Sequence, residues 1–371
     1  MEAVKAIFDP EIWARVPPGF WAAVFFVFGS IVGSFLNVCI YRMPLGLSVV
    51  SPPSHCPHCK YSIPWFRNVP LLTWLSLRGK CKNCGAPISV RYFLVELLTG
   101  ATFLACWLAF GHTSAWLALA YALFLAGLIT ATFIDFEHFI IPDEITIGGM
   151  GVGLLCSFLL PALHGESLVT GGMKQSILGL AVGAGLIYAI LRAGKLLFGR
   201  QRLALPPNTK IVFTETAVHL PDQEIPYEEL FYRQSDAIIL QAQTVELVDR
   251  GYQNVRVRLA LLGKKLEIGD EVLNPETCLY LEVITSEMIL PREAMGLGDV
   301  KFMAAIGAFL GWQATIFSLM VSSMIGSVVG IALIVLGKRE WSSRLPYGPY
   351  IAMAAVIWIF WGKRLVGIFF P

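Results

Sequence analysis

The fold is decided by residues 113–134, which read TSAWLALAYALFLAGLITATFI and hold no charged side chain. A run of about 18 apolar residues is long enough to cross a bilayer as a helix. Other uncharged runs reach that length too, among them Phe20–Tyr41 and Ile145–Leu163. The chain of 371 residues is 56% hydrophobic and only 15% charged, with a mean hydropathy of +0.66. This composition excludes a water-soluble globular protein and predicts a polytopic α-helical membrane protein.

Charge is distributed unevenly along the chain. The formal net charge is +2, but residues 199–293 hold 10 basic and 15 acidic side chains, a balance of −5, and the remainder therefore carries +7. An excess of Lys and Arg outside one acidic segment is typical of membrane proteins with basic cytoplasmic loops. No broadly basic face indicates nucleic acid, so we expect the lipid bilayer, and not nucleic acid, as a partner.

The basic residues also predict the topology. Residues 42–91 hold seven Lys and Arg side chains and no Asp or Glu, which places this loop in the cytoplasm and the N-terminus outside. About eight membrane segments then alternate across the bilayer, the first of them a signal anchor. The expected segments are Phe20–Tyr41, Tyr92–Phe110, Thr113–Ile134, Ile145–Leu163, Gln175–Leu191, two from the uncharged run Phe302–Leu336, and Tyr347–Trp361.

The run Phe302–Leu336 is too long for a single crossing. Its 35 residues would span about 52 Å as one helix at ~1.5 Å per residue, whereas the hydrocarbon core is ~30 Å thick. We therefore predict a break at Gly311-Trp312-Gln313, which gives one short helix and one full helix.

Residues from about Leu203 to Leu290 alternate apolar and polar side chains between turn signals. Alternation at period two is typical of half-buried strands, so the segment 199–293 is expected to be a mostly β cytoplasmic insert. Such an insert could dock a substrate or regulate the site, or it could be passive, since loops tolerate added length at little entropic cost. The predicted domains are an N-terminal segment with the first helix (1–41), a cytoplasmic loop (42–91), helices two to five (92–198), the insert (199–293) and the C-terminal helices (294–371).

Four of the eight cysteines form two CxxC pairs in the basic loop. The pairs Cys56-Pro-His-Cys59 and Cys81-Lys-Asn-Cys84 are 21 residues apart, and four thiolates at such spacings can close a tetrahedron around Zn²⁺. A complete set of four ligands indicates structural zinc, because catalytic zinc keeps an open position. His58 could in principle replace one ligand, and unligated or disulfide-bonded cysteines are the alternative.

Two aspartates lie at the ends of apolar runs. Asp135 directly follows the run 113–134, and Asp299 precedes the run that begins at residue 302. Ionisable groups at membrane depth are functional candidates, although a single one near a helix end is often an ordinary interfacial residue. The predicted topology places both at cytoplasmic ends, where they could face each other. Two facing carboxylates, one ionised and one protonated, are what general acid/base hydrolysis of a peptide requires.

The residues around Asp299 read Gly296-Leu-Gly-Asp-Val-Lys301. Gly296 and Gly298 remove side chains ahead of the carboxylate, so the backbone could approach a substrate strand closely. Lys301 is expected to extend to the surface.

With these motifs the chain resembles the type IV prepilin leader peptidases, whose GxGD aspartic-protease motif matches Gly296-Leu-Gly298-Asp299. The resemblance covers nearly the whole chain except the insert. The other matching segments are Val32-Gly-Ser-Phe-Leu-Asn-Val-Cys-Ile-Tyr-Arg42, the two CxxC pairs, Asn68-Val-Pro, Ser89-Val-Arg-Tyr-Phe-Leu-Val-Glu-Leu-Leu98, and Ile134-Asp135 followed by Ile141-Pro-Asp143.

The resemblance implies a bifunctional enzyme of the bacterial inner membrane. Such an enzyme cleaves the short basic leader of type IV prepilins or type II secretion pseudopilins on the cytoplasmic side, then N-methylates the new terminus with S-adenosylmethionine. It also implies that Asp135 and Asp299 are the catalytic pair and that Asp143 is not catalytic. The residues of a methyltransferase site stay unknown, because the sequence has no glycine-rich dinucleotide fingerprint.

Two hypotheses concern the acidic residues. The first takes Asp299, at a helix N-terminus, as the base, and Asp135, at a helix C-terminus, as the acid, because the helix dipole favours a carboxylate at the N-terminus. The second notes that Asp135, Glu137, Asp143 and Glu144 lie in a stretch without Lys or Arg, which could attract a basic leader. Ordinary solvated charge explains the same stretch equally well.

Two polar residues in the apolar segments are expected to make contacts within the protein. Glu96 is expected to pair with Arg91 or Arg42, and Asn37 to join two helices.

Two other functions fit parts of the sequence. A transporter or scaffold with a zinc knuckle is one alternative function, but its ionisable groups would lie nearer the membrane midplane. The other is a GxGD intramembrane protease with different substrates, against which the four-Cys loop argues.

Overall fold

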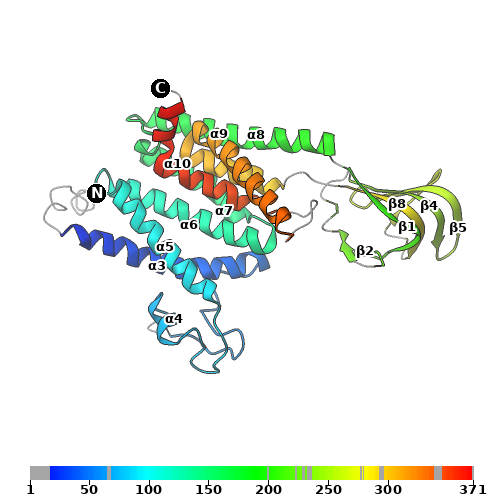
Figure 1. Ribbon diagram of the computed structural model, residues 1–371, viewed down its shortest axis with the longest axis horizontal. Coiled ribbons are helices and arrows are strands. Elements are labelled where there is room, and N and C mark those ends of the chain that lie inside the picture. The colour runs from blue at the N-terminus through cyan, green and yellow to red at the C-terminus, as the bar shows by residue number, and fades with distance from the viewer. Residues whose placement is uncertain are drawn as a thin grey trace. The chain divides into compact units, whose positions relative to one another are not determined.

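The computed structural model describes residues 17–64, 68–198, 200–221, 224–227, 230–231, 236–275, 278, 280–291, 296–337 and 345–369. The chain divides into two compact units, one of residues 1–188 with 297–371 and one of residues 189–296. The first unit is built of helices and the second of an antiparallel sheet (Figure 1). Residues 1–16 of the predicted N-terminal segment lie outside the described part of the chain.

In the described part of the chain, seven long helices build the first unit, and one of them continues into the second. Short helical turns at Met43–Leu45 (η1), Leu72–Ser76 (α4) and Pro161–His164 (η3) lie between them. The long helices are α3 (Pro18–Arg42), α5 (Val90–Phe110), α6 (Ala115–His138), α7 (Asp143–Leu159), α8 (Val169–Phe198), α9 (Leu297–Val335) and α10 (Gly348–Phe369).

Helices α3 and α5 pack through small residues. A Cβ atom at Gly33 would lie 2.8 Å from the Cα of Glu96, and one at Gly100 would lie 2.5 Å from Ser30 Oγ. Apolar packing between membrane helices depends on such close approach, because lipid tails are as apolar as the side chains. Asn37 is buried on α3, and its Nδ2 donates to the carbonyl oxygen of Tyr92 at 3.0 Å. The prediction that Asn37 joins two helices is confirmed.

Helix α6 lies inside the helical unit and contacts α3, α5, α7 and α10. About half of its side chains are buried, including Phe124, whose ring stacks on Phe309 of α9 at a centroid distance of 4.4 Å. The last buried residue of α6 is Asp135. A helix that is apolar on all sides belongs in the interior, so the run that decides the fold also becomes the core of the bundle.

Helix α9 is broken at Gly311, where φ is 83° and ψ is 174°. Glycine adopts this backbone conformation at little cost. The break leaves the Ala308 carbonyl free for other donors, and the hydroxyls of Ser176 and Ser157 donate to it at 2.7 Å and 3.4 Å. The predicted division of the run into a short and a full helix is confirmed.

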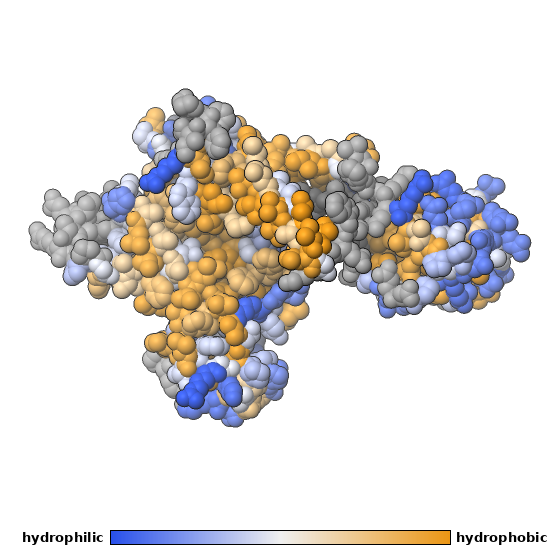
Figure 2. All heavy atoms as spheres, in the orientation of Figure 1, coloured by the Kyte–Doolittle hydropathy of each residue, from blue (hydrophilic) through white to orange (hydrophobic). Residues whose placement is uncertain are grey.

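Five helices in the described part of the chain are long and apolar enough to cross a membrane: α3, α5, α6, α8 and α9. The apolar part of α10, Gly348–Gly362, is shorter, and α7 has only 17 residues. Figure 2 shows apolar side chains over the visible surface of the helices and polar ones over the sheet and the loop that holds α4. The protein is therefore polytopic, and the number of eight crossings stays a prediction.

The second unit is an eight-stranded antiparallel sheet with strand order β3-β2-β1-β8-β4-β5-β6-β7. Its buried core includes Ile211, Ile238, Val283 and Met288. This confirms a separate, mostly β region. The strands are β1 (Arg200–Phe213), β2 (Ala217–His219), β3 (Glu224–Pro226), β4 (Ile238–Leu247), β5 (Gly251–Ala260), β6 (Lys265–Ile268), β7 (Glu271–Leu273) and β8 (Leu281–Pro291).

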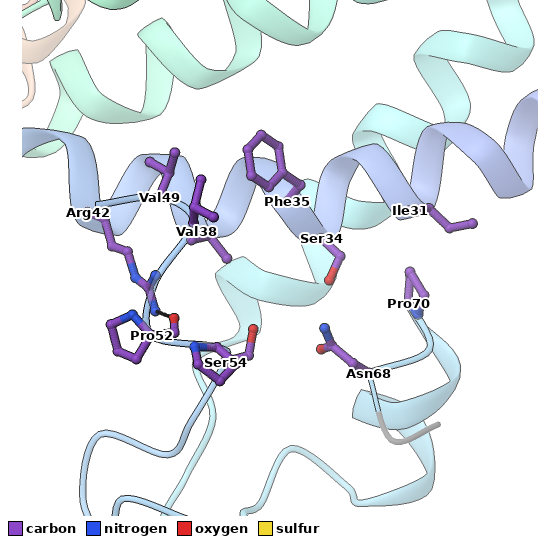
Figure 3. Close-up of a pocket in the computed structure, with 12 residues that line it drawn as sticks. Ile31, Ser34, Phe35, Val38, Arg42, Val49, Pro52, Ser54, Asn68 and Pro70 are labelled. Atoms are coloured by element: carbon purple, nitrogen blue, oxygen red, sulfur yellow. Dashed lines mark hydrogen bonds between the residues drawn. The ribbon is translucent and has the colours of Figure 1, made fainter. Parts of the chain in front are cut away.

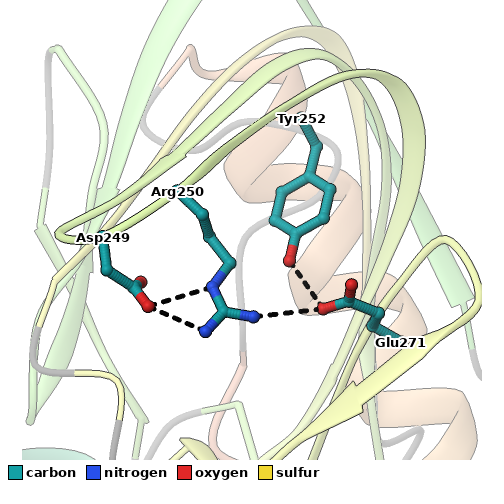
Figure 4. A network of polar contacts seen from close by, with 4 residues as sticks. All are labelled: Asp249, Arg250, Tyr252 and Glu271. Carbon is teal, nitrogen blue, oxygen red and sulfur yellow. Dashed lines mark hydrogen bonds and ion pairs between the residues drawn. The ribbon is translucent and has the colours of Figure 1, made fainter.

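A surface network ties the β4–β5 turn to the edge strand β7 (Figure 4). Arg250 donates to Asp249 at 2.7 Å and 3.0 Å and to Glu271 at 3.4 Å, and the Tyr252 hydroxyl donates to Glu271 at 2.7 Å. These side chains are exposed, and exposed ion pairs contribute little to stability. The network therefore fixes the local geometry of the sheet edge.

Candidate active site and metal centre

The Asp135 carboxyl lies in the last turn of α6 and is only 6% exposed. Its Oδ2 accepts a hydrogen bond from the backbone N–H of Gly348 at 2.9 Å. Gly348 is the first residue of α10, so the carboxyl of Asp135 lies at the N-terminus of one helix although it belongs to the C-terminus of another.

Asp299 lies in the first turn of α9 and is half-buried. The preceding Gly298 packs on Ile141, since a Cβ at Gly298 would lie 3.5 Å from the Ile141 Cβ. Ile141 also lies near Gly348, which is next to the other aspartate. A Cβ at Gly348 would lie 3.2 Å from Ile141 Cδ1 and 2.8 Å from Asp135 Oδ2. Ile141 therefore lies beside both Gly348, whose N–H binds Asp135, and Gly298, which directly precedes Asp299.

The helix-end argument for two different roles does not survive this geometry. Both carboxyls have a helix N-terminus next to them, α10 for Asp135 and α9 for Asp299. A helix N-terminus favours negative charge. The dipoles therefore do not single out Asp299 as the base.

The acidic stretch, which runs from the last turn of α6 to the first turn of α7, carries two ion pairs. Lys301 Nζ lies 2.7 Å and 2.9 Å from the carboxylate oxygens of Asp143, and Arg91 is ion-paired with Glu137. Lys301 is 38% exposed, so it lies near the surface as expected, but on a specific partner. Because cations from other elements neutralise two of the four acids, this geometry weakens the hypothesis that the stretch attracts a basic leader.

Gly348, whose N–H binds Asp135, was not among the residues predicted from the sequence. The signal present is Pro346-Tyr-Gly-Pro-Tyr350 directly before an apolar run, which indicates a turn and the start of a helix, since proline fits the first turn. Nothing in it names a distant carboxylate as the acceptor, because the donor is a backbone amide.

The four predicted metal-binding cysteines converge. The Sγ atoms of Cys56, Cys59, Cys81 and Cys84 lie within 4.8 Å of one another. The two distances between pairs are 3.8 Å for Cys56–Cys84 and 4.0 Å for Cys59–Cys81. His58 is not part of this group. The cluster could hold a metal ion.

Two similar backbone turns present these thiols. Cys56 N–H donates to the carbonyl of Tyr61 at 3.0 Å, and Cys81 N–H donates to that of Ala86 at 2.8 Å. The residue after each second cysteine has a positive φ, 57° at Lys60 and 72° at Gly85. The side chain of Asn83 donates to Cys59 Sγ and lowers the pKa of this thiol to about 6. Metal binding needs the thiolate, so this contact prepares Cys59 as a ligand.

The predicted ion pair of Glu96 is wrong. Glu96 is buried, and its Oε2 accepts from the backbone N–H of Leu71 at 2.7 Å. Arg42 instead donates to the carbonyls of Ser48 at 3.0 Å and Pro52 at 2.8 Å. A buried carboxyl needs hydrogen-bond donors, and here a backbone amide is one of them. Glu96 thereby fixes the start of α4 to α5.

An open cavity of about 270 Å³ lies between α3 and the loop that follows it (Figure 3). Ile31, Phe35 and Val38 of α3 form an apolar wall. Ser34 and Asn68 are among its polar lining residues, and Arg42 enters it already bonded to Pro52.

Comparison with known proteins identifies the family. The model for the bacterial peptidase A24 N-terminal domain matches residues 27–110, and the model for the type IV leader peptidase family matches residues 122–203 and 276–331. Together they cover well over half of the chain. The chain belongs to the type IV leader peptidase family. The model for the type IV leader peptidase family leaves residues 204–275 unmatched between its two segments, and these residues belong to the sheet unit.

Several curated relatives are named prepilin leader peptidase/N-methyltransferase, and some of them match this chain over most of its length. A prepilin leader peptidase/N-methyltransferase of Aeromonas hydrophila is 28% identical over 375 residues, covering 94% of this chain and 93% of the relative. One from Legionella pneumophila is 25% identical over 94% of both chains. One from Myxococcus xanthus is 44% identical over 171 residues, 45% of this chain and 48% of the relative. No solved structure matches the chain significantly.

Proposed function

We propose that this protein is a membrane aspartic peptidase that removes the leader from prepilins and then methylates the new N-terminus with S-adenosylmethionine. Both activities are part of the names of relatives that match 94% of this chain. The structural observation that carries the proposal is the buried Asp135 carboxyl, which shares the neighbour Ile141 with the turn that bears Asp299. Type II secretion pseudopilins stay an expectation from the resemblance.

The two aspartates divide the hydrolysis between them. One carboxylate takes a proton from water as the water oxygen attacks the scissile carbonyl carbon, and the other carboxyl gives its proton to the carbonyl oxygen. Collapse of the tetrahedral intermediate breaks the C–N bond: the proton taken from water passes to the leaving amine, and one hydroxyl proton of the intermediate returns to the second carboxylate as the new C=O forms. Because Gly298 has no side chain, none lies between the backbone just before Asp299 and an approaching substrate strand.

A cleavage assay with purified protein and a prepilin bearing a basic leader tests this function. Asp299→Asn and Asp135→Asn are each expected to abolish cleavage. Asp143→Asn is the matched control, because Asp143 is exposed and pairs with Lys301, and it should keep most of the activity. Full cleavage by Asp299→Asn would refute the two-aspartate mechanism. A transporter or scaffold would show no cleavage in any of these proteins.

Zinc is the metal that the cysteine cluster fits best. Four sulfurs at about 2.3 Å from a central Zn²⁺ in a tetrahedron lie about 3.8 Å from each other, and the pairs here are 3.8 Å and 4.0 Å apart. Cys56, Cys59, Cys81 and Cys84 would each supply a thiolate, and the ion would staple a loop that has little core of its own. Elemental analysis should give one zinc per chain, and Cys81→Ala should lose it.

The methyl donor has no assigned residues. None of the described residues that line the cavity beside α3 is acidic and could face a sulfonium or ammonium group, and the Arg42 guanidinium in the cavity is held by backbone carbonyls. These residues do not fit the donor well, and no step is assigned to them. Transfer of a labelled methyl group to a cleaved prepilin tests the second activity directly.

The site is proposed to face the cytoplasm of a bacterial inner membrane. Support comes from the basic loop 42–91, which the positive-inside rule places there, and from the apolar helices. The sheet unit would then also be cytoplasmic and could dock the substrate. Replacing Leu203–Leu290 with a short linker tests this role, and unchanged turnover of a cognate prepilin would exclude docking.

A further inference from the structure

The N–H of Gly348 binds a carboxyl that lies 213 residues earlier in the chain, with an N···O distance of 2.9 Å. No side chain fits at this position. An ideal Cβ would lie 2.8 Å from Asp135 Oδ2 and 3.3 Å from its Cγ, and also 3.2 Å from Ile141 Cδ1. Since φ at Gly348 is not positive, the requirement for glycine comes from space and not from backbone conformation.

The turn that carries this amide is held independently of Asp135. The hydroxyl of Tyr347 is hydrogen-bonded to Ser322 Oγ at 2.9 Å and to Ser323 Oγ at 3.0 Å. Both serines belong to the part of α9 that follows the break at Gly311. The amide is therefore placed before any substrate arrives, which is what a preorganised polar group requires.

A backbone amide can only donate, so its partner oxygen must act as an acceptor in both protonation states of the carboxyl. Because the hydroxyl oxygen of a carboxyl is a weaker acceptor than its carbonyl oxygen, this hydrogen bond favours Oδ1 as the site of the proton that Asp135 gains or gives during hydrolysis. We propose that Gly348 is a positioning residue for Asp135, which fixes the carboxyl orientation and reserves Oδ1 for the proton that moves in catalysis. This inference rests on the proposed peptidase function, because it assigns an atom to the proton transfer of that reaction.

Gly348→Ala tests the proposal by moving the carboxyl. Ordinary contacts to a Cβ begin near 3.4 Å, so Asp135 Oδ2 must retreat by about half an ångström and lose its donor. Misplacement of catalytic groups by about 1 Å can cost ~100-fold in rate. We expect kcat for leader cleavage to fall at least about 30-fold, with KM changed less than about twofold.

Two variants separate positioning from damage to the fold. Gly330→Ala adds the same methyl group to α9, where it meets only the Leu345 side chain, at 3.2 Å, and it should cleave like the wild type. Tyr347→Phe keeps Gly348 but removes the hydroxyl that holds the turn, and it should lower kcat about threefold to tenfold at constant KM. Methyl transfer to a cleaved prepilin peptide should persist in all three variants.

The double variant Gly348→Ala with Ile141→Val shows whether the loss of kcat comes from the clash with Asp135 or from the clash with Ile141. Valine lacks the Cδ1 atom that an alanine at 348 would meet, but it leaves the clash with Asp135 in place. The double variant should stay as slow as Gly348→Ala. Restored kcat would show that crowding of Ile141 caused the loss, and would overturn the proposal. So would wild-type kcat in Gly348→Ala, or a raised KM with kcat unchanged. A wild-type protein without leader cleavage would instead refute the peptidase function itself.

Discussion

Helix α8 packs so closely on helix α9, which bears Asp299, that one added methyl group should separate them. An ideal Cβ at Gly179 would lie 2.0 Å from the carbonyl oxygen of Gly307, and one at Gly183 would lie 2.5 Å from that of Met303. Ordinary contacts begin near 3.4 Å. Gly179→Ala therefore requires the two backbones to move apart by about 1.4 Å, because neither contact atom belongs to a flexible side chain.

The size of the effect follows from two opposing terms. Alanine gains about 1 kcal/mol over glycine in helix propensity, whereas overpacking of a tight interface costs about 1–3 kcal/mol and more where only backbone can yield. For Gly179→Ala we expect a net loss of at least about 2 kcal/mol. At ~2 °C per kcal/mol for a chain of this size, the apparent unfolding midpoint should fall by about 4 °C or more.

Gly185→Ala is the matched control on the same helix, because a Cβ there has nothing within 4 Å. It should unfold at the wild-type temperature or slightly above. Thermal unfolding of both variants in one detergent, followed by intrinsic fluorescence, compares them. Leader cleavage should also drop about tenfold or more in Gly179→Ala alone, since α9 begins beside Asp299. Equal midpoints for the two variants would refute the reasoning from interhelical distance.

Three further predictions concern parts outside the α8–α9 interface. Lys60→Gly should slow the loss of metal from the cysteine cluster to a chelator. Lys60 has φ 57°, and this left-handed backbone conformation costs a residue with a side chain ~1–2 kcal/mol. A faster loss of metal would contradict the prediction. Asp143→Ala and Lys301→Ala should each lower stability by less than ~1 kcal/mol, and the double variant by no more than either, since the pair is exposed; additive losses in a double-mutant cycle would contradict a direct pair. Burial lowers the pKa of His164 to about 4, so its contribution to stability is complete above the unfolded pKa of ~6.5 and is lost as the pH falls through 4. The unfolding midpoint should drop over that window, and His164→Gln, which can still donate to Ser157, should show a smaller drop.

The parts of this protein that could be predicted are those whose cause is local in the sequence. Length and the absence of charge predict the long apolar helices, and the excess length of the run that begins at Phe302 alone requires the break found at Gly311. The spacing of Cys56, Cys59, Cys81 and Cys84 gives the cluster, because each CxxC turn presents two thiols without help from the rest of the chain. In each case the reason is a length or a spacing that no tertiary contact changes.

The parts that escaped prediction depend on backbone groups far away in sequence. Glu96 binds the amide of Leu71 and not the arginines nearby, and Asp135 binds the amide of Gly348. Amides are identical at every position, so no residue type marks the partner. Lys301 and Asp143 were both recognised as members of their motifs, but their pairing depends on how α7 and α9 approach each other. A sequence therefore identifies a buried carboxyl more readily than its donor.

The pairing of the terminal strands of the sheet unit explains how helices α8 and α9 can accommodate this unit between them in the sequence. Strand β1 follows α8 and strand β8 precedes α9, and the two pair antiparallel from Arg200 opposite Pro291 onward. Paired residues in an antiparallel ladder are only about 5 Å apart, so the chain leaves the sheet close to where it entered. The ends of α8 and α9 are then constrained much as a short loop would constrain them, and the tight contact of Gly179 with Gly307 can form whatever lies between. This arrangement makes the insert compatible with catalysis without requiring that it take part.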